Sequence, residues 1–105
     1  GHSLAVVPAI HRRLCAMREA RVTVNTGVGL HARPAAVLVQ AAKKFACSVM
    51  IEYEGQTVDA RSILQVLSLG VKDGRQITLR TDGEGEAEAL AALVALFENG
   101  LVLDG

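Results

Sequence analysis

The chain has few aromatic side chains and no excess of charge of either sign. Its 105 residues include no tryptophan, one tyrosine and two phenylalanines, and 11 basic residues balance 11 acidic ones. A nucleic-acid interface needs a basic surface or aromatic side chains on which bases stack, so this composition argues against a nucleic-acid partner. Charged residues or glycines interrupt every apolar stretch, which argues against insertion into a membrane.

Cysteine is also scarce. Cys15 and Cys47 form no CxxC pair, and they have no metal-type spacing with the three histidines. We therefore expect two reduced thiols in a cytoplasmic protein and no metal site.

The length and the apolar content favour a single domain with a hydrophobic core. Half of the residues are hydrophobic, which is too many for a disordered chain. We divide the chain into an N-terminal extension, residues 1–16, and a domain, residues 17–105. The extension begins with what resembles a tag remnant, and Met17 has the character of a biological start. An upstream start, a linker or a short accessory helix over residues 10–17 are the open alternatives for the rest of it.

Alternation, helical periodicity and turn residues predict seven elements in the domain. Capping and stop signals bound both the short helix and the last helix. The order β-α-β-β-α-β-α favours a two-layer α/β sandwich with a mostly antiparallel sheet. The predicted elements are a strand over 20–25, a helix over 32–45, strands over 48–53 and 56–60, a short helix between Ser62 and Gly70, a strand over 76–80, and a helix that starts among Glu84, Glu86 and Glu88 and ends at Asn99-Gly100.

The stretch from Gly29 to Ala36, GLHARPAA, joins a glycine loop to the first helix. His31 stands at or beside the helix N-cap, and Pro34 suits a first helical turn because the missing N–H has no acceptor there. A helix N-terminus attracts anions, so a phosphoryl group on the imidazole would meet free backbone N–H groups. Arg33 adds a guanidinium whose planar fork suits phosphate oxygens. The alternative is a plain capping histidine beside a solvated arginine, and the complete motif favours the phosphoryl site.

These groups suit a phosphoryl carrier better than a free-standing enzyme. The sequence has no Walker loop for a nucleotide, no acidic cluster at metal-ligand spacing and no base paired with the histidine. We therefore expect no cofactor, and partner proteins must supply and remove the phosphoryl group.

A second candidate region is the short helix that follows Arg61. Ser62 suits a helix cap, and a phosphate at this position would add nearly two negative charges to a docking surface. Nine residues cannot bury all of their apolar side chains in one direction, so one or two of these side chains form the apolar centre of a partner surface beside His31. The apolar side chains concerned are Ile63, Leu64, Val66 and Leu67.

From Met17 to Leu101 the sequence resembles the histidine-containing phosphocarrier protein family HPr of the bacterial sugar phosphotransferase system. The resemblance rests on the stretch Gly29 to Ala35, on Arg61-Ser62-Ile63-Leu64 with Ser68-Leu69-Gly70, and on the order of the elements. It implies an α+β open-faced sandwich in which three helices cover one face of a four-stranded antiparallel sheet. Residues 1–16 have no counterpart in the simple carrier.

The resemblance also implies roles and partners. His31 would be phosphorylated on Nδ1 by enzyme I, which is charged by phosphoenolpyruvate, and sugar-specific IIA proteins would accept the group with the help of Arg33. Ser62 matches a serine that a kinase/phosphorylase modifies in many members, which creates a partner for a transcriptional regulator in some bacteria. Gln65 replaces a glycine found in many of those members. From the apolar side chains of the short helix itself, we expect partner contacts at Ile63, Leu64 and Leu67.

Two further interpretations remain open at this level. The domain could be a regulatory module of the same fold in a nitrogen-related phosphotransfer branch, or it could come from a longer polypeptide that carries other phosphotransferase modules.

Overall fold

Alternating apolar and polar residues form the strands of one antiparallel sheet. The computed structural model describes residues 17–102, in which the strands are β1 (Arg18–Thr23), β2 (Ser48–Tyr53), β3 (Gln56–Asp59) and β4 (Gln76–Asp82). The strands are hydrogen-bonded in the order β1-β4-β2-β3, and each neighbouring pair is antiparallel. The two central strands, β4 and β2, are therefore far apart in the sequence.

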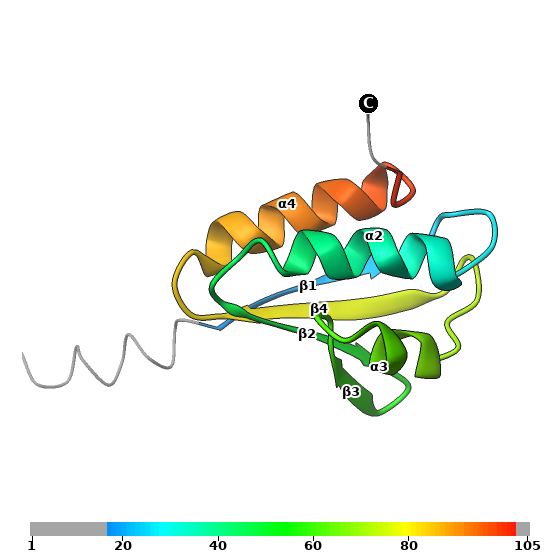
Figure 1. Ribbon diagram of the computed structural model, residues 1–105, viewed down its shortest axis with the longest axis horizontal. Coiled ribbons are helices and arrows are strands. Elements are labelled where there is room, and N and C mark those ends of the chain that lie inside the picture. Colours follow the sequence, from blue (N-terminus) through cyan, green and yellow to red (C-terminus); the bar gives the residue numbers. More distant parts are fainter. Residues whose placement is uncertain (1–16, 103–105) are drawn as a thin grey trace, which may run out of the picture.

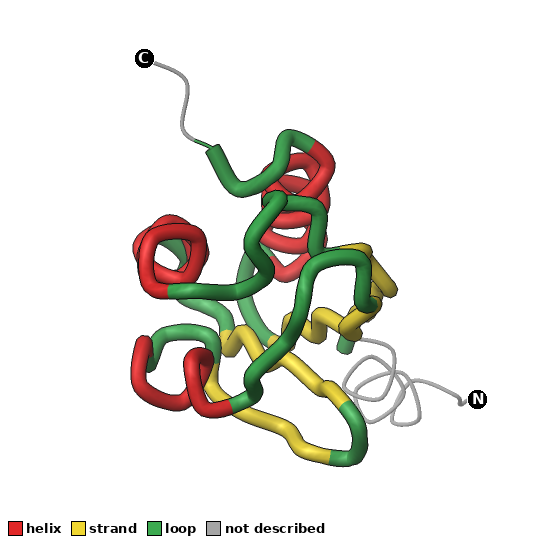
Figure 2. Tube along the Cα trace, turned by 90° about the vertical axis from the view of Figure 1, so that its right-hand side faces the viewer, coloured by secondary structure: helices red, strands yellow, loops and turns green. Residues whose placement is uncertain are grey.

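Three helices lie on one face of this sheet. They are α2 (Ala32–Ala42), α3 (Ile63–Ser68) and α4 (Glu86–Glu98), and α4 packs over β1 and β4 while α3 packs near β3 (Figure 1). The view along the layers places all of the helices on the same side of the strands (Figure 2). The predicted element order and the two-layer open-faced sandwich are confirmed. None of the helices within residues 17–102 is long and apolar enough to cross a membrane.

The core lies between the helices and the sheet. Ile77 and Leu79 face inward from β4, in the alternation typical of a strand, and both layers contribute fully buried side chains. Burial of a single large aliphatic or aromatic side chain contributes about 1.5–3 kcal/mol, so the core between the helices and the sheet is the main source of stability. The largest fully buried side chains include Phe97, Leu38, Ile51, Ile77, Leu79 and Leu93.

The other face of the sheet is polar. Arg80 of β4 donates from Nε to Glu19 of β1 at 3.0 Å and also pairs with Glu52 of β2. The hydrogen bond to Glu19 raises the pKa of the Arg80 guanidinium, and the hydrogen bond to Glu52 raises this pKa further. An ion-paired, solvated outer face explains why the sandwich has only two layers.

The first helix is shorter than predicted. The expected range reached residue 45, but α2 ends at Ala42, and Phe45 follows in a turn whose N–H donates to the Ala42 carbonyl. The segment after this end is held by Arg61, whose guanidinium donates to the carbonyl oxygens of Phe45 and, at 2.6 Å, of Cys47. These carbonyls are thus satisfied outside a helix.

The last strand is longer than predicted, because a polar residue can face the core there. The expected range ended at Arg80, whereas β4 continues to Asp82. Thr81 is fully buried, and its hydroxyl donates to the carbonyl of Glu86 at 2.9 Å. The first strand is displaced in the other direction and ends at Thr23 instead of residue 25. Val24 nevertheless keeps two backbone hydrogen bonds, to Arg75 and from Gly74.

The described residues contain one of the two cysteines. Cys47 is a free thiol that is only 2% exposed, and burial raises its pKa. The thiol therefore stays protonated and unreactive at neutral pH. Cys15, the N-terminal extension and the possible accessory helix lie outside the described residues, so the expectations for them remain predictions.

We predict that Arg61→Ala lowers the free energy of unfolding by about 2 kcal/mol, because two carbonyls lose a charged donor. Urea unfolding at neutral pH measures the change. Arg21→Ala is the matched control, since Arg21 is exposed and its side chain has no hydrogen bond to residues 17–102. Equal stabilities of the two variants would contradict the assigned role of Arg61.

Candidate functional site

His31 is the N-cap residue of α2, as the sequence predicted. Its backbone is extended (φ −81°, ψ −177°), and its carbonyl accepts the N–H of Ala35 at 2.9 Å. The imidazole makes no capping hydrogen bond and is exposed to solvent. A ring at this position is free to react and lies beside the start of a helix.

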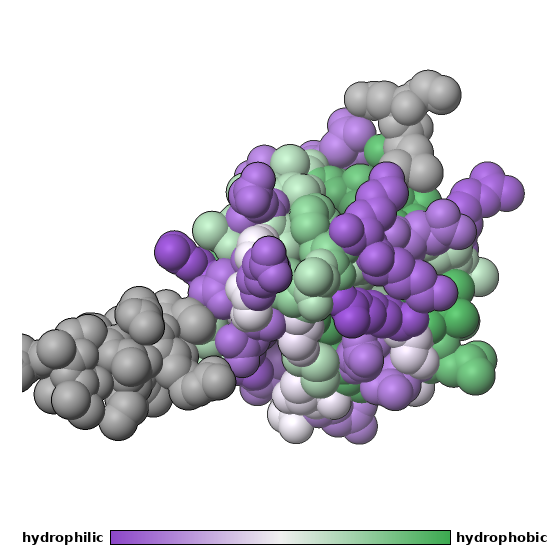
Figure 3. All heavy atoms as spheres, turned by 60° about the vertical axis from the view of Figure 1, so that its left-hand side comes forward, coloured by the Kyte–Doolittle hydropathy of each residue, from purple (hydrophilic) through white to green (hydrophobic). Residues whose placement is uncertain are grey.

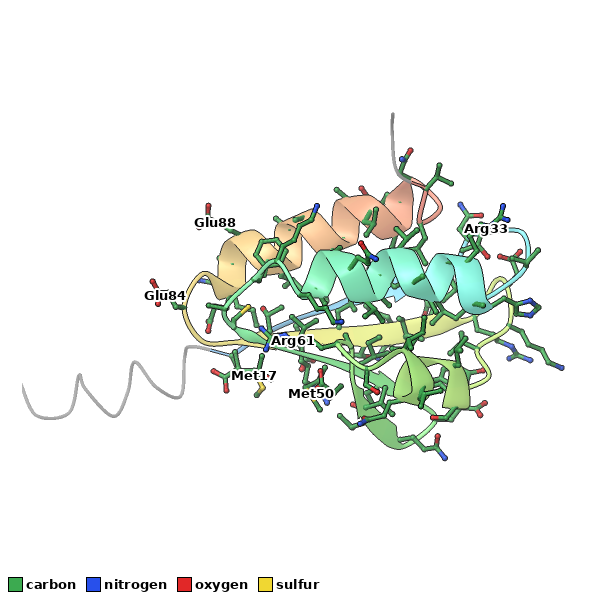
Figure 4. All side chains as sticks on the ribbon, viewed as in Figure 1. Met17, Arg33, Met50, Arg61, Glu84 and Glu88 are labelled. Atoms are coloured by element: carbon green, nitrogen blue, oxygen red, sulfur yellow. The ribbon has the colours of Figure 1, made fainter. Side chains whose placement is uncertain are left out.

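The groups around the imidazole suit an anion. The first amides of α2, those of Ala32 and Arg33, have no acceptor within the helix and point toward its N-terminus. Pro34, which has no N–H, is buried in the first turn. Arg33 is exposed at the start of α2 (Figure 4). The structure thus places the exposed imidazole of His31 and the side chain of Arg33 along one surface hollow, at the helix start with its free N–H groups.

Two open hollows flank the imidazole. One hollow lies toward residues 100–102, and both His31 and Arg33 line it. The other hollow lies toward α3, and both His31 and Lys72 line it. The first hollow is lined by Thr26, Val28, His31, Arg33, Pro34, Gly100, Leu101 and Val102, and the second by Leu30, His31, Ala32, Leu67, Gly70, Val71 and Lys72.

The loop that carries His31 is built against a second loop, residues 70–75. The N–H of Leu30 donates to the carbonyl of Val71 at 3.0 Å. Gly29 has φ +79°, and a Cβ there would lie 2.7 Å from the same carbonyl oxygen. Only glycine fits this close approach and this backbone conformation. The sequence predicted only a glycine loop here. The structure gives one of its glycines, Gly29, a specific packing role.

The helix α3 has one buried side and one exposed side. Val66 is fully buried, whereas Ile63 is 37% and Leu64 is 78% exposed. Leu67 is half-buried and lines the hollow that contains His31. The sequence predicted that some of these apolar residues belong to the core and others to the surface, and the structure identifies Val66 as the core residue. In the space-filling view, hydrophobic side chains lie at one edge and across the middle of the face, among hydrophilic ones (Figure 3).

Ser62 is the N-cap residue of α3. Its hydroxyl oxygen accepts the N–H of Gln65 at 3.3 Å, and the side-chain oxygen of Gln65 accepts the N–H of Asp59 at 3.0 Å. At the rise of an α-helix, Ser62 and Leu67 are about 8 Å apart along the axis. Ser62 therefore lies at the end of α3 that is remote from Leu67.

Three residues of this region were not predicted from the sequence. Asp73 and Thr26 organise the loop before His31, and Lys72 lines a hollow with it. The stretch Lys72-Asp73-Gly74-Arg75 has the composition of a turn. The preference of aspartate for bonding turn amides was the available signal, but nothing indicated that the amides would belong to residues 26 and 27. Within residues 17–102 no cluster of three histidine, cysteine or acidic side chains could hold a metal ion.

Comparisons with known proteins agree with this architecture. Residues 18–99 match the family model described as the PTS HPr component phosphorylation site. The HPr-like protein Crh of Halalkalibacterium halodurans is 45% identical over 82 residues, which are 78% of this chain and 98% of the relative. The HPr-like protein Crh of Bacillus subtilis is 44% identical over 79 residues, which are 75% and 93% of the two chains.

Solved structures show the same likeness. A crystal structure of the phosphocarrier protein HPr from Bacillus anthracis has a TM-score of 0.73 and 46% identity, and the match covers 76% of this chain and 95% of that one. A structure of HPr from Thermoanaerobacter tengcongensis has a TM-score of 0.78 and 39% identity, with 84% and 99% covered. The matched residues include His31, its loop and all seven described elements, and the chain belongs to the HPr phosphocarrier family of the phosphotransferase system.

Proposed function

We propose that the chain accepts a phosphoryl group on His31 from phospho-enzyme I and passes it to IIA proteins of a sugar phosphotransferase system. The observation that carries the proposal is the exposed imidazole of His31 at the start of α2, which no capping hydrogen bond occupies. Family membership supports the same role. The proposed setting is the bacterial cytoplasm, where phosphoenolpyruvate charges enzyme I.

The proposed transfer is a displacement at phosphorus. The lone pair of His31 Nδ1 forms a bond to phosphorus, the bond between phosphorus and the donor atom of enzyme I breaks, and that atom keeps the electron pair. The guanidinium of Arg33 and the first amides of α2 stabilise the charge on the phosphoryl oxygens. An N-terminal dipole contributes about 0.3–1 kcal/mol, up to about 2 kcal/mol. Stabilisation of this size holds the phosphoryl group without preventing onward transfer.

The proposed partner surface is α3 together with the hollow beside His31. Ile63 and Leu64 supply exposed apolar area, and Leu67 connects it to the imidazole. Apolar residues at the centre of an interface with polar surroundings are typical of protein contacts. Enzyme I and IIA proteins would thus meet the same face in turn.

Ser62 is proposed as a regulatory phosphorylation site for a serine kinase/phosphorylase. A phosphate on the N-cap of α3 would place nearly two negative charges beside Leu64 on the proposed docking surface. This charge would weaken enzyme I docking, and it could be what a transcriptional regulator recognises.

A second candidate function is a regulatory HPr-like module whose phosphorylation state controls partners. Similarity to Crh proteins favours it, since a solved structure of one of them is described as the Bacillus subtilis catabolite repression HPr. A nitrogen-related phosphotransfer branch is the other regulatory setting. Rates of transfer to sugar-specific and to nitrogen-branch IIA proteins distinguish a carrier for sugar uptake from such a module.

We predict that the wild-type chain gains one acid-labile phosphoryl group from phosphoenolpyruvate, magnesium and catalytic enzyme I, and that His31→Ala gains none. The reason is that the nucleophile is lost while the N-cap backbone is kept. Intact mass before and after acid treatment measures the gain. Acid-labile phosphorylation of the variant would refute the assignment, and no gain by the wild type with a competent enzyme I would refute the carrier function.

We predict that Leu64→Ala raises the KM of enzyme I for this carrier about fivefold and leaves kcat unchanged. The substitution removes apolar contact area and no reacting group. Met17→Ala is the control, since Met17 is 53% exposed and lies at the opposite end of the molecule from Arg33 (Figure 4). The measurement is the initial rate of phosphoryl acceptance against carrier concentration. An equal KM for both variants would remove α3 from the docking surface.

We predict that Ser62→Asp slows acceptance from enzyme I about tenfold at limiting carrier, which corresponds to a penalty of about 1.4 kcal/mol. Ser62→Asn keeps a capping side chain without the charge and should accept at close to the wild-type rate. If Ser62→Asp reacts as fast as the wild type, Ser62 has no regulatory role of this kind.

A further inference from the structure

The loop before His31 is held by one side chain from a distant part of the chain. Asp73 lies between α3 and β4, and its Oδ1 accepts the N–H of Thr26 and the N–H of Gly27, both at 2.9 Å. These amides are 47 and 46 residues away in the sequence. Because one oxygen accepts both N–H groups, the contact fastens this loop to a segment that is distant in the sequence, and we call it the clamp.

The clamp continues inside the loop. The hydroxyl of Thr26 donates to the carbonyl of Gly29 at 2.7 Å and accepts the N–H of Val28 at 3.1 Å. Beyond Gly29, the backbone bond from Leu30 to Val71 fastens the other end. The five residues that lead to His31 are therefore fixed at both ends against residues 71–73.

The imidazole of His31 depends on this backbone for its position. The ring makes no side-chain hydrogen bond to residues 17–102, and no side chain caps α2. A displacement of the loop would therefore move the ring relative to the first amides of α2 and to Arg33.

We infer that Asp73 is a positioning residue for phosphoryl acceptance by His31. The inference rests on the proposed function. Asp73 acts through the loop and not on the phosphoryl group, because its carboxylate occupies the amides of Thr26 and Gly27. Because the amides of Thr26 and Gly27 already donate to Asp73, they are not free to bind phosphoryl oxygens. The amides at the start of α2 remain for that purpose. Misplacement of a reacting group by about 1 Å can lower a rate by up to about 100-fold.

The test compares Asp73→Ala, Asp73→Asn and Glu84→Gln in acceptance from phospho-enzyme I. Asp73→Asn removes the charge but keeps an oxygen that accepts both N–H groups. Glu84→Gln is the control for loss of one negative charge, since Glu84 is exposed at the opposite end of the molecule from Arg33 (Figure 4). We expect Asp73→Ala to lower kcat about tenfold with a nearly unchanged KM, and the other two variants to behave as the wild type.

Two kinetic outcomes would overturn the inference. Wild-type kcat for Asp73→Ala means that the clamp is dispensable. An equal loss in Asp73→Ala and Asp73→Asn means that the charge acts directly and that the loop geometry does not matter. If Asp73→Ala does not fold, Asp73→Ser, whose shorter side chain cannot span both amides, takes its place.

A second readout needs no phosphoryl transfer. In the NMR spectrum of the unphosphorylated protein, Asp73→Ala should shift the ring resonances of His31 and speed amide exchange at Thr26 and Gly27, whereas Asp73→Asn should not. Unchanged ring resonances in Asp73→Ala would overturn the inference. A wild-type chain that accepts no phosphoryl group refutes the proposed function, and the NMR comparison still decides the role of Asp73.

Discussion

The close approach of two loops at Gly29 is the constraint on which the site depends. One loop leads from β1 to α2 and the other leads from α3 to β4. At Gly29 a Cβ would lie within 2.7 Å of the Val71 carbonyl oxygen, and the next residue donates its N–H to that oxygen. The position of His31 follows from this contact, because the residue after Leu30 has little freedom once Leu30 is hydrogen-bonded and buried.

The same contact joins the reactive histidine to the proposed docking surface. The loop that receives Gly29 begins directly after α3, and Leu67, Val71 and His31 line one hollow. The buried side of α3, represented by Val66, attaches the helix to the core, while Leu64 remains available to a partner. The short helix α3 thus packs one apolar side against the core and exposes another apolar side to solvent.

Much of this arrangement could be predicted from the sequence. Local patterns located all seven elements, and the cap positions of His31 and Ser62 were correct. The sequence pattern missed contacts made by side chains far away in the sequence, such as those of Arg61 with the carbonyls of Phe45 and Cys47. The clamp of Asp73 was missed for the same reason. Patterns within ten or fifteen residues show a turn, but they do not show which amides the turn residue will meet after folding.

The complete GLHARPAA motif does not by itself make the site. The loop that presents His31 is held by residues 71–75, and Val24 exchanges hydrogen bonds with Gly74 and Arg75. During synthesis the ribosome releases the histidine long before this second loop. A nascent chain that ends before residue 71 therefore has the motif without the loop that holds it. The site is complete only once residues 71–75 have been made and have packed against the loop before His31.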